Sequence, residues 1–241
     1  ASGSEIFCSG LLLSARWFAV SQLDYDGVQV IVLPDRETAE YCSVDLYNLI
    51  EGDCVFFLPD SGRRLEKSNY KASLGVQRTS AIGKIIDYKE GKLVIVTYPS
   101  AFAEGVPTAS KIRESLMKFS VGDEISHDDI VESLFSNGFE RVDFVSEPGQ
   151  FAVRGAIVDI FSYSYNDPFR ISFFGDEIET INIFDCNTQL SKEKVVSAEI
   201  YPDLAGGDEE SETLVQIADI LPSSSLIWLD SSDMYKEQAF Y

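Results

Sequence analysis

The sequence predicts an α/β fold in which a parallel sheet flanked by helices is interrupted by a small inserted α+β domain. Three observations lead to this class. Residues 1–100 alternate short apolar runs with amphipathic stretches, which is typical of parallel strands joined by crossover helices. From about residue 116 strands follow one another with little helix between them, and the residues after 201 are too few to build a separate core. We therefore expect segments 1–115 and 202–241 to form one domain around an inserted domain at 116–201.

The first segment reads as alternating strands and helices. Strands are expected at four short apolar runs, Glu5–Ser9, Val28–Leu33, Cys54–Leu58 and Leu93–Thr97. Helices are expected between them, at Leu12–Leu23, Asp35–Ile50 and about Ala72–Tyr88. The second helix has a clear start, because the Asp35 carboxylate can accept hydrogen bonds from the backbone amides of the first turn. This order predicts a doubly wound sheet of the nucleotide-binding type.

The inserted segment combines one helix with several strands. The helix is expected at Asp128–Ser136. Strands are expected near Arg141–Val145, Phe151–Phe161, Pro168–Phe174, Glu177–Phe184 and Val195–Tyr201. Gly175-Asp176 separates two runs of β-branched and aromatic residues, and glycine accepts the positive φ that tight turns need. The sequence therefore predicts a hairpin at this point.

The last segment is expected to return to the first domain. Residues 205–211 read as a solvated linker, Thr213–Ile220 as a helix and Ser225–Asp230 as a buried strand. Because this segment is short, we expect Leu226–Leu229 to add a strand to the first sheet. The pattern at Met234–Tyr241 stops in mid-helix, which predicts that the chain is a piece of a longer protein.

The charge balance limits the partners of the chain. Forty acidic residues against nineteen basic ones leave a formal net charge of −21, which repels a phosphate backbone and predicts little direct binding of DNA. A DNA mimic is a remote alternative, because the acidic residues are scattered along the chain. No apolar run reaches the length that crosses a bilayer, and residues 1–4 do not resemble a signal peptide. We expect a cytoplasmic protein without membrane contact.

Metal and catalytic sites are not expected. The four cysteines contain no CxxC pair, and His127 is the only histidine, so a zinc site lacks ligands. His127 stands beside two aspartates that indicate a helix start, and no serine or cysteine motif accompanies it, so we expect a solvated side chain. The acid pairs Asp176-Glu177 and Glu209-Glu210 fall in turns and linkers. No catalytic residue is assigned.

The position that follows the first predicted strand is where a phosphate-binding loop belongs in such a fold. It reads Ser9-Gly-Leu-Leu-Leu-Ser-Ala-Arg16, with one glycine and no Gly-Lys-Ser/Thr. We interpret Gly10 and Ser14 as remnants of a degenerate P-loop and expect no bound cofactor, with a weak residual nucleotide site as the alternative. Asp230 ends an apolar strand as a magnesium-binding acid does in ATPases, but such an acid has no role without the loop lysine.

Partner binding is indicated by the strand at Pro168–Phe174. Alternation places Arg170 and Phe174 on one face of this strand and three apolar residues on the other. An aromatic residue beside an arginine on a polar face is the composition of interface hot spots. In the preceding strand, Arg154 shares its side with small alanines that leave it accessible, and Gly155 marks a bulge or a close backbone approach. The alternative is that both arginines are solvated surface charges.

Several runs together resemble the UvrB-like region of bacterial transcription-repair coupling factors. The most specific are EPGQFAVRGAIVDIF at 147–161, PFRISFFGDEIETINIFD at 168–185 and QLSKEKVVSAEIYP at 189–202, which resemble the second domain that these factors share with UvrB. FCSGLLLSARWFAVSQL at 7–23 resembles their degenerate phosphate loop, and VIVLPDRETAEYCSVDL at 30–46 the strand and helix that follow. The missing Gly-Lys-Thr and the short segment 61–75 favour coupling factors over UvrB itself.

The resemblance implies a non-catalytic module with a degenerate P-loop-NTPase-like domain that recruits UvrA to stalled RNA polymerase for nucleotide excision repair. It implies that Arg154, Arg170 and Phe174 contact UvrA. The parent protein is expected to be a translocase that uses ATP and magnesium, and that contacts RNA polymerase and DNA, through domains beyond residue 241. The leucines after Gly10 and the loop 162–167 depart from the family pattern. A UvrB-type ATP-dependent damage-recognition subunit is the alternative, followed by an unrelated nucleotide-binding enzyme.

Overall fold

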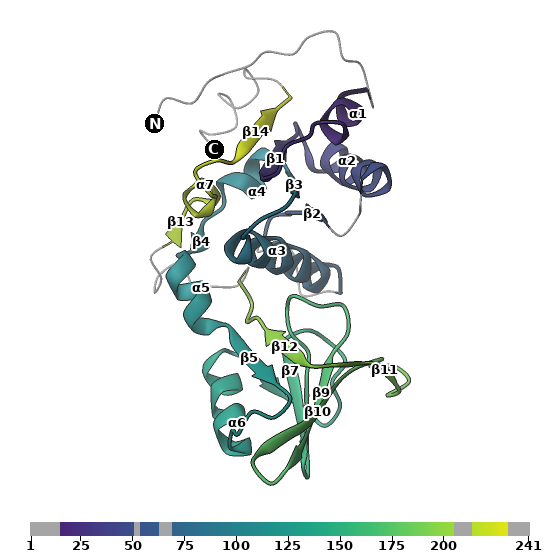
Figure 1. Ribbon diagram of the computed structural model, residues 1–241, viewed down its shortest axis with the longest axis vertical. Helices are drawn as coiled ribbons and strands as arrows, with labels where there is room; N and C mark the ends of the chain where they lie inside the picture. The colour runs from purple at the N-terminus through teal and green to yellow at the C-terminus, as the bar shows by residue number, and fades with distance from the viewer. Residues whose placement is uncertain (1–14, 51–53, 63–68, 205–213, 231–241) are drawn as a thin grey trace.

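The computed structural model of the chain describes residues 15–50, 54–62, 69–204 and 214–230. These residues form an upper unit built on a parallel sheet and a lower unit built on a larger, mostly antiparallel sheet (Figure 1). The predicted strand Glu5–Ser9, the loop residues Gly10 and Ser14, the linker at 205–211 with Glu209-Glu210, and Met234–Tyr241 lie outside the described residues. The degenerate phosphate loop therefore stays a prediction from the sequence.

The upper sheet contains four described strands in the order β14-β1-β3-β2, all parallel. They are β1 Val28–Val32, β2 Val55–Phe57, β3 Leu93–Thr97 and β14 Leu226–Leu229. The predictions of these strands and of a parallel sheet are confirmed. Every residue of β1 and β3 is buried, which is expected where helices cover both faces of a parallel sheet.

Helices cover both faces of the upper sheet. α1 Ala15–Ser21 and α2 Arg36–Leu49 pack on one face, and α3 Asn69–Asp87 packs on the other. The core between α3 and the sheet is made of residues such as Val30, Ile82 and Ile95. The predicted cap of α2 is confirmed, because the Asp35 carboxylate accepts a hydrogen bond of 2.8 Å from the Thr38 amide. None of the described helices has the length and apolarity that crossing a bilayer requires.

Strand β14 joins the upper sheet, as predicted, and pairs with β1, although about 130 residues separate it from β3. The expectation of a buried strand was wrong, because Ile227 and Leu229 are exposed. The alternate residues Leu226 and Trp228 are half-buried, and Trp228 packs against the core on the α2 side of the sheet. There the Trp228 indole donates a hydrogen bond of 3.1 Å to the Gln29 side-chain oxygen.

Short elements that the sequence pattern did not predict connect the two units. α4 Pro99–Ala103, β4 Val106–Pro107 and α5 Ala109–Ser115 follow β3. β4 pairs with β13 Leu214–Val215, and α7 Ile217–Ile220 comes next. The predicted helix Thr213–Ile220 was therefore too long. Gln216 and Asp219 exchange hydrogen bonds that define the start of α7, so the residues before them pair as a strand instead.

The lower unit is a six-stranded sheet in the order β11-β10-β9-β8-β7-β6. Helix α6 His127–Ser136 packs on one face of it, together with the small ladder of β5 Met117–Ser120 and β12 Ser197–Ile200. The six strands are β6 Glu140–Arg141, β7 Gln150–Arg154, β8 Ile157–Ile160, β9 Phe169–Phe174, β10 Glu177–Phe184 and β11 Ser191–Val195. The α+β character predicted for this segment is confirmed.

Three strand predictions in the lower unit need correction. The run Phe151–Phe161 is two strands, because Arg154 pairs with Ile157 across a turn that begins at Gly155, whose φ is +59°. Gly155 is thus the first residue of a hairpin turn and not a bulge, since glycine tolerates this φ. The strand expected at Arg141–Val145 ends at Arg141, and Val195–Tyr201 is divided between β11 and β12. The hairpin at Gly175, with φ +64°, is confirmed.

The chain passes back from the lower unit to the upper one at Tyr201. Tyr201 and Leu204 pack in the core on the α3 side of the upper sheet. The Tyr201 hydroxyl also donates a hydrogen bond to Asp87 at the end of α3, and its ring lies so close to Gly83 that a Cβ there would stand 3.1 Å from it. These contacts join the lower unit to α3.

The thiol of Cys42 is expected to resist chemical modification in the folded chain. Cys42 has no exposed surface, and burial raises the pKa of its thiol well above the usual range, which suppresses the reactive thiolate. Cys186 is only partly buried. Mass spectrometry after iodoacetamide treatment at pH 8 should show alkylation of Cys186 before Cys42, and of both in denaturant. Equal rates in the folded chain would contradict the buried position.

Candidate functional site

The six-stranded sheet has one face in the core and one face turned away from it. On β9, Phe169, Ile171 and Phe173 are buried against α6 and the β5–β12 ladder. The alternate residues Arg170 and Ser172 are half-buried, and Phe174 is 79% exposed. The predicted alternation is confirmed. Arg170 and Phe174 therefore belong to the outer face of the sheet.

A single buried carboxylate organises this outer face. Asp159, at the register partner of Arg170 on β8, has a side chain that is only 1% exposed. Arg170 approaches it with two parallel hydrogen bonds, Nε to Oδ1 at 2.7 Å and Nη2 to Oδ2 at 2.9 Å. Arg154 donates to the same Oδ2 from the other side. A buried carboxylate needs such partners, because an unpaired charge in an apolar environment is strongly unfavourable.

Further contacts fix the Arg170 side chain. Its guanidinium carbon lies 4.2 Å from the centre of the Phe184 ring. Nη2 donates to the Gln189 side-chain oxygen at 3.0 Å, and Nη1 donates to the Gln189 carbonyl at 3.3 Å. Gln189 adopts a φ of +61°, which is uncommon for a residue with a side chain. The hydrogen bonds that Arg170 donates to the Asp159 carboxylate raise the pKa of Arg170, so its charge is constant.

The position of Arg154 differs from the expected one. Ala152 does not leave it open to solvent, because Ala152 is buried in a small cluster with Val145 and Phe161. Ala156 lies in the hairpin turn, outside the strands. The Arg154 side chain is 35% exposed and its guanidinium carbon lies 5.2 Å from the centre of the Phe144 ring, which itself is 63% exposed. Arg154 is thus an ion-paired and partly covered arginine.

Phe174 lies at the end of the same face, next to the Gly175 hairpin. It is four residues along β9 from Arg170, a separation of about 13 Å in an extended strand. With 79% of its surface exposed, it contributes little to the core of the free chain. The outer face thus presents a pair of arginines bound to Asp159 and, four residues along β9 from Arg170, an exposed aromatic ring.

Two residues of this site were missed by the sequence analysis. Asp159 carries a signal in the sequence, since a lone carboxylate inside the apolar run Ile157–Phe161 is typical of a buried, paired charge. Phe144 lies in the loop between β6 and β7 and carries no periodic signal, so only the fold reveals its contact with Arg154. The structure brings Arg154 and Arg170 together through Asp159.

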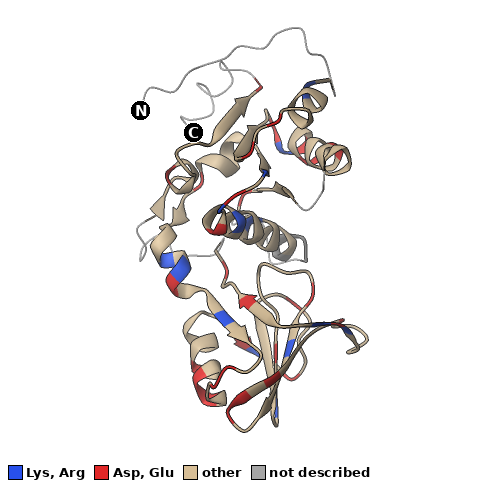
Figure 2. Cartoon of the chain, in the orientation of Figure 1, with Lys and Arg blue, Asp and Glu red and all other residues tan. Residues whose placement is uncertain are grey.

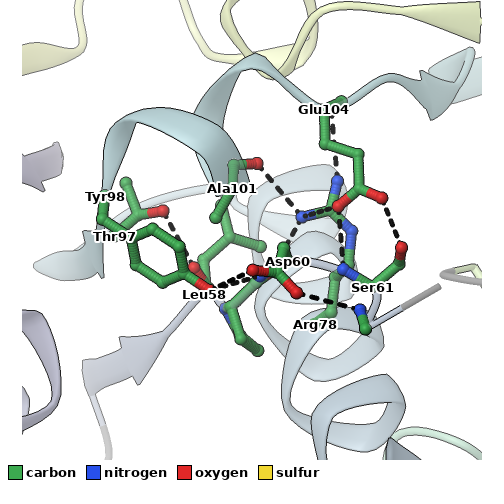
Figure 3. A network of polar contacts seen from close by, with 10 residues as sticks. Leu58, Asp60, Ser61, Arg78, Thr97, Tyr98, Ala101 and Glu104 are labelled. Atoms are coloured by element: carbon green, nitrogen blue, oxygen red, sulfur yellow. Dashed lines mark hydrogen bonds and ion pairs between the residues drawn. The ribbon is translucent and has the colours of Figure 1, made fainter. Parts of the chain in front are cut away.

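The carboxyl ends of β2 and β3 form the edge where open α/β sheets commonly bind ligands. Here side chains of the chain itself fill the region (Figure 3). Arg78 on α3, with 1% exposure, donates to the carbonyls of Pro59, Ala101 and Glu104 at 2.8, 3.2 and 3.2 Å. The Glu104 carboxylate lies 3.5 Å from Arg78 and accepts from the Ser61 amide.

A second set of bonds continues this network. The Tyr98 hydroxyl donates to Asp60 at 2.7 Å, and burial raises the pKa of Tyr98 so that it remains a donor. The Thr97 hydroxyl donates to the Leu58 carbonyl at 2.8 Å. These bonds tie the loop after β2 to the loop after β3 (Figure 3). The network holds the edge of the sheet together.

The two other residues considered as candidates, Asp230 and His127, make contacts within the fold. Asp230 forms an ion pair with Arg16 of α1. His127 was expected to be solvated, but it is half-buried: its ring lies 5.6 Å from that of Phe173, and its Nε2 atom is buried. No group of three metal-ligating side chains occurs within the part of the chain that the structure describes.

Acidic residues are spread over both units and do not gather in one segment (Figure 2). With a net charge of −21 for the whole chain, most of the surface repels polyanions. In the cluster around Asp159, two arginines share one carboxylate, which leaves a local positive excess. The outer face of the lower sheet therefore suits a partner that presents carboxylates and a recess for an aromatic ring.

Comparison with known proteins places this sheet in a described family. Residues 117–204 match the model of the UvrB interaction domain. The chain is 31% identical over 202 residues to the transcription-repair-coupling factor of Bacillus subtilis and 26% identical over 194 residues to that of Haemophilus influenzae. These matches cover 82% and 80% of the chain but only 17% of each relative. The Escherichia coli factor is 37% identical over 81 residues, which are 34% of the chain and 7% of that protein.

Proposed function

The chain belongs to the transcription-repair-coupling factor family, and from this premise we propose that it is the part of such a factor that docks UvrA. In this proposal the chain carries out no chemistry of its own and brings the excision-repair machinery to a stalled RNA polymerase. The chain spans about a sixth of the length of the relatives it matches. An ATP- and magnesium-dependent translocase activity, and contacts with RNA polymerase and DNA, are therefore proposed for the rest of the protein.

One observation carries the proposal. Arg154, Arg170 and Phe174 lie on one outward face of the sheet within the residues that match the UvrB interaction domain. Arginine and aromatic side chains dominate the binding energy of protein interfaces, and a ring that is 79% exposed has surface to bury in a complex. The arginine cluster supplies orientation, since guanidinium–carboxylate pairs have a defined geometry.

A non-catalytic role is supported by the sequence of the loop after the first predicted strand. That loop has bulky leucines where phosphate approach needs glycines, and it has no Gly-Lys-Ser/Thr. We therefore propose that this part of the protein holds no cofactor. The relatives named above are coupling factors, so a UvrB-type ATP-dependent damage-recognition subunit is not favoured.

The proposal is tested by calorimetric titration of UvrA with the chain and with its Phe174→Ala variant. We expect the wild-type chain to bind and the variant to bind about ten- to thirty-fold more weakly, which corresponds to about 1.4–2 kcal/mol for a truncated hot-spot residue. Val196→Ala is the matched control, because Val196 is equally exposed, at 80%, between β11 and β12. Absence of wild-type binding, or equal loss in both variants, would overturn the docking role.

A further inference from the structure

Arg170 and Arg154 differ in how much of each guanidinium is available to a partner. An arginine has five N–H bonds. In Arg170, four of them are engaged, two with Asp159 and two with Gln189. Its side chain is 18% exposed and one face of it covers Phe184. Only one N–H of Arg170 remains for an incoming acceptor, too few for a bidentate grip on a carboxylate.

Arg154 is held by fewer bonds. It donates to Asp159 through Nη2, and none of the residues described in the structure accepts from its other N–H bonds. Its side chain is 35% exposed, about twice as much as that of Arg170. One edge of its guanidinium is thus paired with Asp159, while another edge is available for a bidentate contact.

Phe144 gives this guanidinium a second support. The Arg154 guanidinium carbon lies 5.2 Å from the ring centre, within the range of a cation–π contact. Phe144 contributes little to the core, since it is 63% exposed and belongs to none of the buried clusters of the described residues. An aromatic ring that supports a guanidinium on one face restricts its rotation and keeps its donors in one plane.

We propose that Phe144 and Asp159 are positioning residues that hold Arg154 for a carboxylate of the partner. Arg170 then acts mainly as a positioning residue that holds the shared carboxylate of Asp159 in place. The inference rests on the proposed docking of UvrA and adds to it the residues that orient Arg154 and the chemical group that Arg154 recognises.

The experiment measures UvrA binding by calorimetry for the wild-type chain, Phe144→Ala, Arg154→Ala and the double variant. Phe144→Ala is expected to weaken binding about ten-fold, whereas Phe144→Tyr, which keeps the ring, should stay within about three-fold of the wild type. Because Phe144 acts through Arg154, the double variant should bind about as weakly as Arg154→Ala alone and not ten-fold more weakly.

Phe135→Ala is the matched control. Phe135 is 53% exposed, but it lies on α6, which covers the opposite face of the sheet, so its truncation should leave binding unchanged. The inference would be overturned, while the docking role stands, if Phe144→Ala bound UvrA as strongly as the wild type. It would also be overturned if the loss of affinity in the double variant equalled the product of the losses in the two single variants. Failure of the wild-type chain to bind UvrA would overturn both. Denaturant unfolding of Phe144→Ala should match the wild type, which separates a binding role from a structural one.

Discussion

Removal of both arginines in the variant Arg154→Ala with Arg170→Ala is expected to abolish docking and also to destabilise the lower unit by about 3–5 kcal/mol. The cause is Asp159. Its side chain is 1% exposed, and these two arginines are its partners in the ion pairs of the described residues. The double variant leaves a buried carboxylate without a countercharge. Denaturant unfolding followed by a spectroscopic probe measures this loss.

A third substitution separates the two effects. Adding Asp159→Asn to the double variant removes the unpaired charge at nearly constant volume, so stability should return to within about 2 kcal/mol of the wild type, while UvrA binding should remain at least about thirty-fold weaker. Lys118→Ala with Lys192→Ala is the control for the loss of two positive charges, since both lysines form exposed ion pairs. If the double arginine variant unfolds like the wild type, the buried ion pair is not a determinant of the fold.

Replacement of Arg78 by methionine is expected to lower the free energy of unfolding of the upper unit by about 3–5 kcal/mol. The guanidinium is 1% exposed and donates to the three carbonyls of Pro59, Ala101 and Glu104. Methionine fills the space but leaves these buried acceptors without donors, each of which costs about 1–3 kcal/mol. Chemical denaturation of the variant measures the difference from the wild type.

The matched control for this substitution is Arg113→Met. Arg113 is exposed, and among the described residues it donates a single hydrogen bond, of 3.2 Å, to the Ile86 carbonyl, so a loss of stability below about 1 kcal/mol is expected. Arg78→Lys keeps the positive charge but not the planar guanidinium, so its loss of stability should fall between those of Arg78→Met and Arg113→Met. Similar stability of Arg78→Met and Arg113→Met would show that the network in Figure 3 does not hold the sheet edge together.

Local patterns in the sequence were sufficient for the elements whose residues interact with near neighbours. The strands Val28–Val32 and Leu93–Thr97 are buried throughout and mostly apolar because helices cover both faces, and such runs are visible in the sequence. Asp35 caps its helix through a contact three residues away. The alternation along β9 placed Arg170 and Phe174 on the outer face, because side chains of a strand alternate with a period of two.

Other features depended on contacts between distant residues. The sequence did not predict that Arg154 and Arg170 share a carboxylate, because Asp159 on β8 meets Arg170 across the β8–β9 pair and Arg154 from β7, and local spacing does not give the registers of these pairs. The predicted extents of the strands that became β6 and β12 were also wrong, because the pairing partner of a strand decides where it ends. Phe144 has no neighbour in the sequence that reveals its contact with Arg154.

The sequence by itself determined that the chain has an α/β unit, that residues near 226–229 return to its sheet, and that one face of β9 carries an arginine and a phenylalanine. These properties follow from hydrophobic periodicity, which acts over a few residues. Only the tertiary structure decided how open each arginine is and which network closes the carboxyl edge of the upper sheet. The physical reason is that burial and ion pairing depend on groups brought together from separate strands and loops, and no local spacing encodes their distances.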